Sequence, residues 1–383
     1  MRRRRLVILS ALAHAPFAPR GIRTRELLRA LEERWDVELI AAPPPPDGPS
    51  RVRPRRFPAV VGHLADGVAL DRYEPWSVRT LLRWSPQADA ALLVGYPFSP
   101  HAYAVPRLAA AGIPYAVDMG DPWVLTELAP DTTALALLRA RRHERRMWTR
   151  AAGAILTTEH QRNSLLRLFP ALRVLVRANG FDPATVGAAP AAARVTGRTL
   201  RLAHFGTIYQ ARVPVVPFLA ALADDGPWER VELHQYGTVV PTAPDCDPRV
   251  GVVLHDPLPW GHAVAEAAGY DAAIVIGNVD SRVLPSKAVD YLTLPVPRVA
   301  LTPDPDGDAL GRYVRDRPGW LTVSPGERDA PGRLAAHVTR AWSQDDLAAP
   351  SSEAWPAVAS RVADFLDDVL ADDRSRAGQA VAA

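Results

Sequence analysis

The chain has little cysteine, no long apolar run and little net charge, and each of these features excludes some classes of protein. Cys246 is its only cysteine, so no disulfide forms within the chain, and this fits a reducing cytoplasm. No apolar run approaches about 18 uninterrupted residues, so we expect no membrane-spanning helix. The formal net charge of 383 residues is only +3, and composition alone therefore gives no argument for nucleic acid. We expect a cytoplasmic, globular protein without a nucleic-acid partner.

Lysine is also scarce, because Lys287 is the only lysine in a chain that otherwise carries its positive charge on arginine. In "VLPSKAVDYL", Ser286 is an N-cap candidate for a helix that begins at Lys287. The free amides and the dipole of a first turn favour an anion, so a cation there costs helix stability. A phosphate bound between the amides and the ammonium group would explain that cost. The alternative is a single lysine left by chance on a surface turn.

Two neighbours of Lys287 extend this interpretation. Asp290 and Tyr291 lie three and four residues further on, along neighbouring faces of the same predicted helix. A carboxylate at residue 290 can accept hydrogen bonds from ribose hydroxyls.

The basic start of the chain has two interpretations. "MRRRRLVILSALAHAPF" resembles a secretory signal, with a basic cluster, an apolar run and an Ala-x-Ala-like sequence. We favour a first buried strand, because "RLVILS" precedes a Pro/Gly loop and a helical pattern from Thr24 to Trp35. Four arginines in the run are candidates for weak, salt-sensitive peripheral contact with a membrane: Arg2, Arg3, Arg4 and Arg5. The arginines of "RRHERRMW" are expected to form a solvated helix face instead.

Short apolar runs alternate with helix-length segments along most of the chain, which predicts an α/β fold with parallel sheets. Expected buried strands of the first half are 36–42, 89–96, 113–120, 152–158 and 173–180. Expected strands of the second half are 200–206, 231–237, 250–256, 270–277 and 297–303. The stretch 43–58 is rich in proline and is expected to be a surface loop.

A linker-like stretch of small residues and prolines, 183–198, separates the two halves. The pattern predicts two Rossmann-like domains that face each other across a cleft, with ligands at the carboxyl ends of the strands. We expect an acceptor-side domain over 1–185, a donor-binding domain over 195–350, and a C-terminal helix and tail over 351–383. The tail reads as a helix with a proline break that crosses back to the first domain.

A second cation-bearing loop strengthens the phosphate interpretation of Lys287. In "LAHFGTIYQARVP", a predicted strand ends at Gly206, and Arg212 stands before the next helix. Glycine permits close approach of the backbone, and arginine is suited to phosphate.

These motifs together resemble a known family. "ILTTEHQRNSLLRLFPALRVLVRANGFD", "LRLAHFGTIYQAR" and "LPSKAVDYL" occur in the order seen in retaining glycosyltransferases of the GT-B fold, of the family 4 kind. "YAVDMGDPWVLTEL" is similar to the family's stretch ending in Arg-Asp-Leu-Trp, with Gly120 where arginine is common and Asp121 and Trp123 in step. The resemblance spans roughly residues 5–370 and implies a hexosyltransferase that uses a nucleotide-diphosphate sugar as co-substrate.

The resemblance assigns roles to individual residues. Arg212 and Lys287 match the pair that grips the donor diphosphate, and Asp290 matches the acidic residue that holds the ribose. Donor-binding positions are therefore expected at Gly206, Arg212, Leu258, Ser286, Lys287 and Asp290. Acceptor-side positions are expected at Gly21, His101, Asp118 and Asp121. The sequence departs from the family at Arg282, where many relatives have a glutamate.

The chemistry of sugar transfer fits these residue types. Negative charge grows on the departing phosphate while the sugar becomes oxocarbenium-like, so fixed positive groups stabilise the transition state. Arg212, Lys287 and helix amides supply such groups, and Asp121 is the expected catalytic carboxylate on the acceptor side. We assign no Asp-x-Asp pair to a divalent ion and expect a metal-independent reaction. The acceptor, a small molecule, a lipid-linked group or a glycan, is not specified by the sequence.

Two alternatives remain beside a retaining glycosyltransferase. A non-catalytic GT-B-fold binding or activator subunit would explain Gly120 and Arg282 as eroded site chemistry. A nucleotide-sugar epimerase on a related fold is the second alternative. Intact Arg212 and Lys287 favour the enzyme that transfers sugar.

Overall fold

The computed structural model divides the chain into two compact units. Unit 1 comprises Met1–Ala178 and Pro356–Ala383, and unit 2 comprises Asn179–Trp355. The structure describes residues 3–15, 18–43, 70–71, 73–123, 133–186, 198–208, 215–237, 247–278 and 282–382, with side chains to residue 371. Arg2, Arg212, Cys246, most of the expected loop at 43–58 and most of the expected linker lie outside the described residues.

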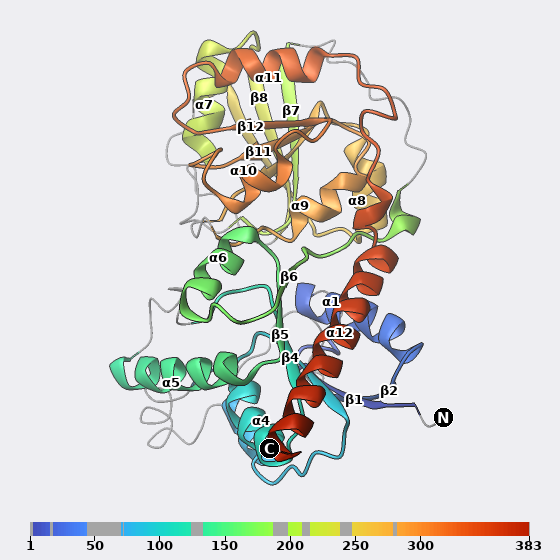
Figure 1. Cartoon of the computed structure of the whole chain (residues 1–383). Helices are drawn as coiled ribbons and strands as arrows, with labels where there is room; N and C mark the ends of the chain where they lie inside the picture. The colour runs from blue at the N-terminus through green and yellow to red at the C-terminus, as the bar shows by residue number, and fades with distance from the viewer. Residues whose placement is uncertain are drawn as a thin grey trace. The chain divides into compact units, whose positions relative to one another are not determined.

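Unit 1 contains a six-stranded, all-parallel sheet with the order β2-β1-β3-β4-β5-β6 (Figure 1). Its strands are β1 (Arg5–Leu9), β2 (Asp36–Ile40), β3 (Ala90–Val94), β4 (Tyr115–Met119), β5 (Gly153–Leu156) and β6 (Val174–Val176). The predicted strand at the start of the chain is confirmed as β1, whose residues 6–9 are buried. β2 and β6 are edge strands that are only partly buried, in contrast to the expected buried strands at 36–42 and 173–180.

Helices cover both faces of this sheet, which is why its inner strands are continuous apolar runs. The helices of the first part are α1 (Pro19–Glu32), α3 (Glu74–Leu81), α4 (Ser99–Ala110), α5 (Ala134–Arg150) and α6 (Glu159–Leu168). α1 begins at Pro19, five residues before the expected start at Thr24, because proline suits the first turn of a helix.

The C-terminal helix α12 (Trp355–Ala382) crosses back to unit 1, as expected. Leu366 and Val369 of α12 share a core with Leu27 and Leu31 of α1. The expected proline break is wrong, since Pro356 is the second residue of α12 and a proline there does not remove a helical hydrogen bond.

Unit 2 contains a second six-stranded parallel sheet, with the order β12-β11-β10-β7-β8-β9. Its strands are β7 (Thr199–Phe205), β8 (Arg230–Tyr236), β9 (Val250–His255), β10 (Ala272–Ile276), β11 (Arg298–Leu301) and β12 (Trp320–Val323). Its helices are α7 (Val215–Asp225), α8 (Trp260–Ala267), α9 (Lys287–Asp290), α10 (Ala309–Val314) and α11 (Ala330–Thr339). The sequence interpretation missed β12, and β9 is an exposed edge where a buried strand was expected.

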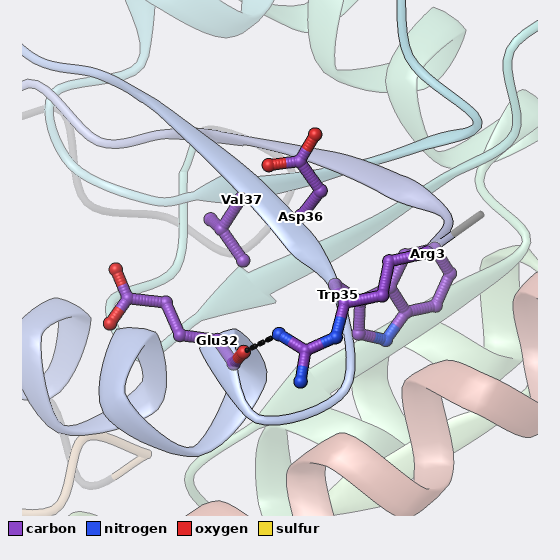
Figure 2. A pocket seen from close by; sticks show the side chains of 5 residues that line it. All are labelled: Arg3, Glu32, Trp35, Asp36 and Val37. Atoms are coloured by element: carbon purple, nitrogen blue, oxygen red, sulfur yellow. Dashed lines mark hydrogen bonds between the residues drawn. The ribbon is translucent and has the colours of Figure 1, made fainter.

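The arginine run at the start of β1 is engaged within unit 1. Arg4 forms an ion pair with Asp367 at 2.9 Å and lies over the Trp35 ring, while Arg5 pairs with Asp36 and Glu38. Figure 2 shows Arg3 donating to the backbone carbonyl oxygen of Glu32, at 3.1 Å, beside a hollow of about 400 Å³. Arg3, Arg4 and Arg5 thus have intramolecular partners, and the expected weak membrane contact of this run stays a prediction. Among the described residues, no helix combines the length and apolar character needed to span a membrane.

Candidate functional site

The strand order of unit 2 points to one place for a ligand. Chain order reverses between β7 and β10, which lie side by side, so the connections leave their carboxyl ends in opposite directions. Open α/β sheets bind ligands at such a switch point. β7 is followed by Gly206 and β10 by Gly277, so both strands end in a residue that exposes backbone.

Lys287 lies next to this switch point, as the first residue of α9. Its Cγ and Cε atoms are each 3.6 Å from the position that a Cβ on Gly206 would occupy. Its Nζ lies 3.7 Å from Asp290 Oδ2 and 5.2 Å from the centroid of the Trp260 ring. The ammonium group is therefore held between a carboxylate and an aromatic face, and its side chain remains 42% exposed.

Asp290 is brought together with Lys287 and Gly206, as the sequence predicted. Burial raises the pKa of the Asp290 carboxyl, and the nearby Lys287 opposes that rise. The side chain is one-third exposed, so the carboxylate can still accept a ligand hydroxyl. Ser286 directly precedes the helix, but its hydroxyl makes no capping bond because its own backbone is already helical. Ser286 therefore has the predicted N-cap position without the side-chain hydrogen bond of a cap.

Tyr291 has a structural position that the sequence did not reveal. Its phenol oxygen accepts a hydrogen bond from the Phe205 amide at 2.7 Å and donates to the Ile274 carbonyl at 3.3 Å. The side chain is fully buried, so it does not share the exposed face of Asp290. Tyr291 fixes the segment that carries Lys287 to the ends of β7 and β10.

Two side chains of this site were missed by the sequence interpretation. Trp260 lies under Lys287 and anchors its indole N–H on Thr293 Oγ1 at 3.1 Å. His204 is buried and its pKa is lowered to about 4, chiefly by desolvation. Its Nδ1 lies 2.8 Å from the Ile274 carbonyl oxygen and must carry the proton, so Nε2 is unprotonated and faces Gly206. The sequence does carry a signal for both residues. His204 stands two residues before Gly206 at the end of a strand, and Trp260 directly follows the loop 255–259.

Of the remaining predicted donor-binding residues, the structure describes Leu258 but not Arg212. Leu258 is 36% exposed in the loop between β9 and α8, where a ligand can reach it. Arg212 lies outside the described residues, so its pairing with Lys287 stays a prediction.

Asp118 lies on β4 in the interior of unit 1. Its Oδ2 accepts from Arg23 Nε at 2.7 Å, and both side chains are 0% exposed. Arg23 also donates to the carbonyl oxygen of Ala178 at 3.0 Å. In this arrangement Asp118 is a buried ion-pair partner of helix α1, which argues against the expected direct contact with an acceptor.

Asp121 has the exposure that Asp118 lacks. It follows β4 by two residues, is 47% exposed, and lies 3.4 Å from Arg20 Nη2. The Arg20 guanidinium occupies the space above Gly120, where a Cβ would come within 1.3 Å of Nη2. The absence of a side chain at Gly120 therefore leaves room for the guanidinium of Arg20 from α1. The Asp121 carboxylate orients that guanidinium.

His101, an expected acceptor-side residue, is buried in unit 1. It lies in the first turn of α4, is 1% exposed, and burial lowers its pKa to about 4. Nε2 lies 3.1 Å from the Val94 carbonyl oxygen and must donate to it. His101 is thus neutral and directed toward β3, so acceptor contact would require it to leave the core.

Gly21 lies in the first turn of α1, where the sequence predicted a glycine loop. A Cβ there would meet the carbonyl oxygens of Ala15 and Leu12 at 2.3 and 2.6 Å.

We expect Gly21→Ala to lower the free energy of unfolding by about 1–3 kcal/mol, because backbone atoms cannot yield as a side chain can. Gly332→Ala is the matched control, since nothing lies within 4 Å of its added Cβ and α11 tolerates alanine. Urea denaturation of both variants measures the difference, and equal midpoints would contradict the packing argument.

The residues that the structure describes include no group of three or more His, Cys, Asp or Glu side chains that could hold a metal ion. The sequence interpretation overlooked two Asp-x-Asp stretches, at 245–247 and at 304–308, and was wrong to count none. In the second, Asp308 caps α10 by accepting from the Gly311 amide at 2.6 Å, and Asp306 pairs with Arg315 at 2.8 Å. Asp247 pairs with Arg249. These carboxylates have structural partners.

Besides the hollow beside Arg3, the structure has a hollow of about 760 Å³ in unit 2. Residues between Pro305 and Arg333 line it, and Lys287 is not among them. None of the predicted site residues lines either hollow. The assignment of the site therefore depends on strand topology and residue chemistry.

Comparison with known proteins gives a match in the first part of the chain. Residues 21–180 match the family model described as a glycosyl transferase 4-like domain. No curated protein matches the chain.

Solved structures show the fold. Anabaena Alr3699/HepE in complex with UDP is similar with a TM-score of 0.54 and 12% identity, over 99% of this chain and 100% of that chain. The lipopolysaccharide outer core galactosyltransferase WaaB, in its apo form, gives 0.58 and 9%, over 95% and 99%. The Methanocaldococcus jannaschii UDP-GlcNAc 2-epimerase, in complex with UDP-GlcNAc and UDP, gives 0.53 and 10%, over 95% and 99%. The two sheets and these neighbours confirm the expected GT-B fold.

Proposed function

We propose, from the match of residues 21–180 to a glycosyl transferase 4-like domain and from the GT-B fold, that the protein transfers a sugar from a nucleotide-diphosphate donor to an acceptor hydroxyl. We propose further that the anomeric configuration is retained and that the sugar is a hexose. The domains proposed for the two substrates are 1–185 for the acceptor and 195–350 for the donor.

The observation that carries the proposal is the position of Lys287. It is the only lysine of the chain, and it lies beside Gly206 at the switch point of unit 2. A half-exposed ammonium group next to exposed strand-end backbone can bind a diphosphate. Asp290, one turn further, supports binding of the ribose, and Leu258 is accessible for the base.

The proposed reaction follows from these positions. The bond between the anomeric carbon and the donor phosphate oxygen breaks, and its electron pair stays on the phosphate. Lys287, with Arg212 as the second predicted cation, stabilises the charge that develops there. The acceptor oxygen bonds to the anomeric carbon on the face that the phosphate leaves, and its proton passes to the leaving phosphate. Asp121 is the proposed carboxylate that orients the acceptor hydroxyl, because it is the exposed one of the two near β4.

A nucleotide panel tests the donor. UDP, dTDP, GDP and ADP are compared by thermal shift, since a ligand that binds only the folded state raises the unfolding midpoint. UDP is the first choice because the HepE structure is a complex with UDP. Release of sugar from the matching nucleotide sugar, followed by NMR of the anomeric product, then distinguishes transferase from epimerase. Binding without turnover would favour the non-catalytic alternative.

We expect sugar transfer or donor hydrolysis to continue in excess EDTA. The predicted cations Lys287 and Arg212 supply positive charge at the diphosphate, and the described Asp-x-Asp carboxylates are engaged elsewhere. Initial rates with and without EDTA measure this. A rate that collapses in EDTA and returns with magnesium or manganese would contradict the expectation.

A further inference from the structure

Helix α5 presents a basic and partly apolar face that is exposed in the described part of unit 1. Figure 1 shows α5 beside α4 in this unit. Its buried side packs Ala140, Met147 and Trp148 into the core. The opposite side follows the helical spacing of three and four residues, and we call it the α5 face. Its members, all exposed, are Leu135, Leu138, Arg141, Arg142, Arg145, Arg146 and Arg150.

The charges of the α5 face have no carboxylate partner among the residues that the structure describes. Arg139, a partly buried arginine of the same helix, does pair with Glu74 at 2.7 Å. Arginines four residues apart, such as Arg141 and Arg145, repel each other along a helix. An anionic surface would relieve this repulsion.

Two leucines show which anionic surface fits. Leu135 and Leu138 are 53% and 66% exposed at the start of the same face. A favourable interaction with the helix dipole explains arginines near the C-terminal end, but it does not explain exposed leucines at the other end. Nucleic acid would offer phosphates to the arginines but no apolar layer to the two leucines. A phospholipid headgroup region offers both, because leucine side chains reach the acyl boundary while arginines bind lipid phosphates.

We propose that the α5 face is a docking surface for membranes rich in anionic phospholipid. The interaction is peripheral and depends on salt, since the apolar contribution is limited to two side chains. This surface differs from the one predicted from sequence, where the arginines at the start of the chain were assigned to lipid. Arg4 and Arg5 have carboxylate partners, whereas the arginines of the α5 face have none among the described residues.

Sedimentation of the full chain with vesicles tests the proposal. Wild-type protein is expected to bind phosphatidylglycerol–phosphatidylcholine vesicles at low salt, to dissociate at high salt, and to ignore pure phosphatidylcholine. Arg142→Gln/Arg145→Gln/Arg146→Gln is expected to weaken binding at least about tenfold. Leu135→Ser/Leu138→Ser should weaken binding severalfold and leave the salt dependence in place.

The matched control is Arg167→Gln/Arg328→Gln/Arg361→Gln, which removes the same charge from exposed arginines of other segments and should bind like wild type. Equal loss in both triple variants would overturn the proposal, since only net charge would then matter. Absence of wild-type binding at low salt would also overturn it, as would binding of duplex DNA through the same arginines without binding of vesicles. Unfolding midpoints close to wild type confirm that the variants fold. Because vesicle binding needs no turnover, its failure leaves the proposed sugar transfer untouched.

Discussion

Replacing Lys287 with alanine is expected to weaken nucleoside-diphosphate binding by about tenfold to a hundredfold and to leave the fold intact. The lost interaction is a charge-assisted hydrogen bond to phosphate, worth about 1.5–3 kcal/mol. Stability should change little, because Lys287 is half-exposed and its partners are an ion pair at 3.7 Å and an aromatic face. Calorimetric titration of the nucleotide found in the thermal-shift panel measures the affinity, and thermal unfolding measures the fold.

Two further variants sharpen this prediction. Lys287→Arg keeps the charge but displaces it on a wider planar group, so we expect partial activity. Asp290→Asn keeps the shape and removes the carboxylate that accepts ribose hydroxyls, so it should lower the affinity for nucleotides while binding of inorganic pyrophosphate is retained. Wild-type affinity in the alanine variant would remove the assignment of Lys287 to phosphate and most of the support for catalysis.

Replacing Asp118 with alanine should produce the largest loss of stability among these variants. Removing one partner of a buried ion pair leaves the other charge without compensation, at a cost of about 3–5 kcal/mol. Arg23 and Asp118 are both 0% exposed and 2.7 Å apart, and Arg23 links β4 to the Ala178 carbonyl. Guanidinium denaturation of Asp118→Ala against wild type measures the loss.

The double variant Arg23→Met/Asp118→Leu provides the control, because replacing both charges with apolar groups of similar volume is often neutral. We expect it to recover most of the stability that Asp118→Ala loses. If Asp118→Ala instead keeps its stability but fails to turn over substrate, the original interpretation of Asp118 as an acceptor-side residue is right and the structural one is wrong.

The sequence anticipated those parts of the site that depend on local order. The sequence correctly placed Lys287 at the start of a helix. It could do so because the preceding strand, loop and proline are signals that lie close to Lys287 in the chain. The sequence also placed Gly206 directly after a strand of the same domain, and the structure shows the Lys287 side chain beside it.

Roles that depend on what a side chain faces could not be read from the sequence. Asp118 and Asp121 are three residues apart in one motif, yet one is sealed against Arg23 and the other is exposed beside Arg20. Spacing along β4 does not say which carboxylate meets helix α1. The same holds for the arginines at the start of the chain, since Arg4 pairs with Asp367, about 360 residues away in the chain.

The sequence by itself therefore determined the α/β class, the two parallel sheets, the return of the C-terminal helix and the unusual place of Lys287. These follow from apolar periodicity and from residues whose chemistry is rare in this chain. Only the tertiary structure decided that Tyr291 braces the site, that His101 and Asp118 are buried, and that the α5 arginines lack carboxylate partners within the described chain. The physical reason is that burial and charge pairing are set by residues distant in sequence, which local patterns do not record.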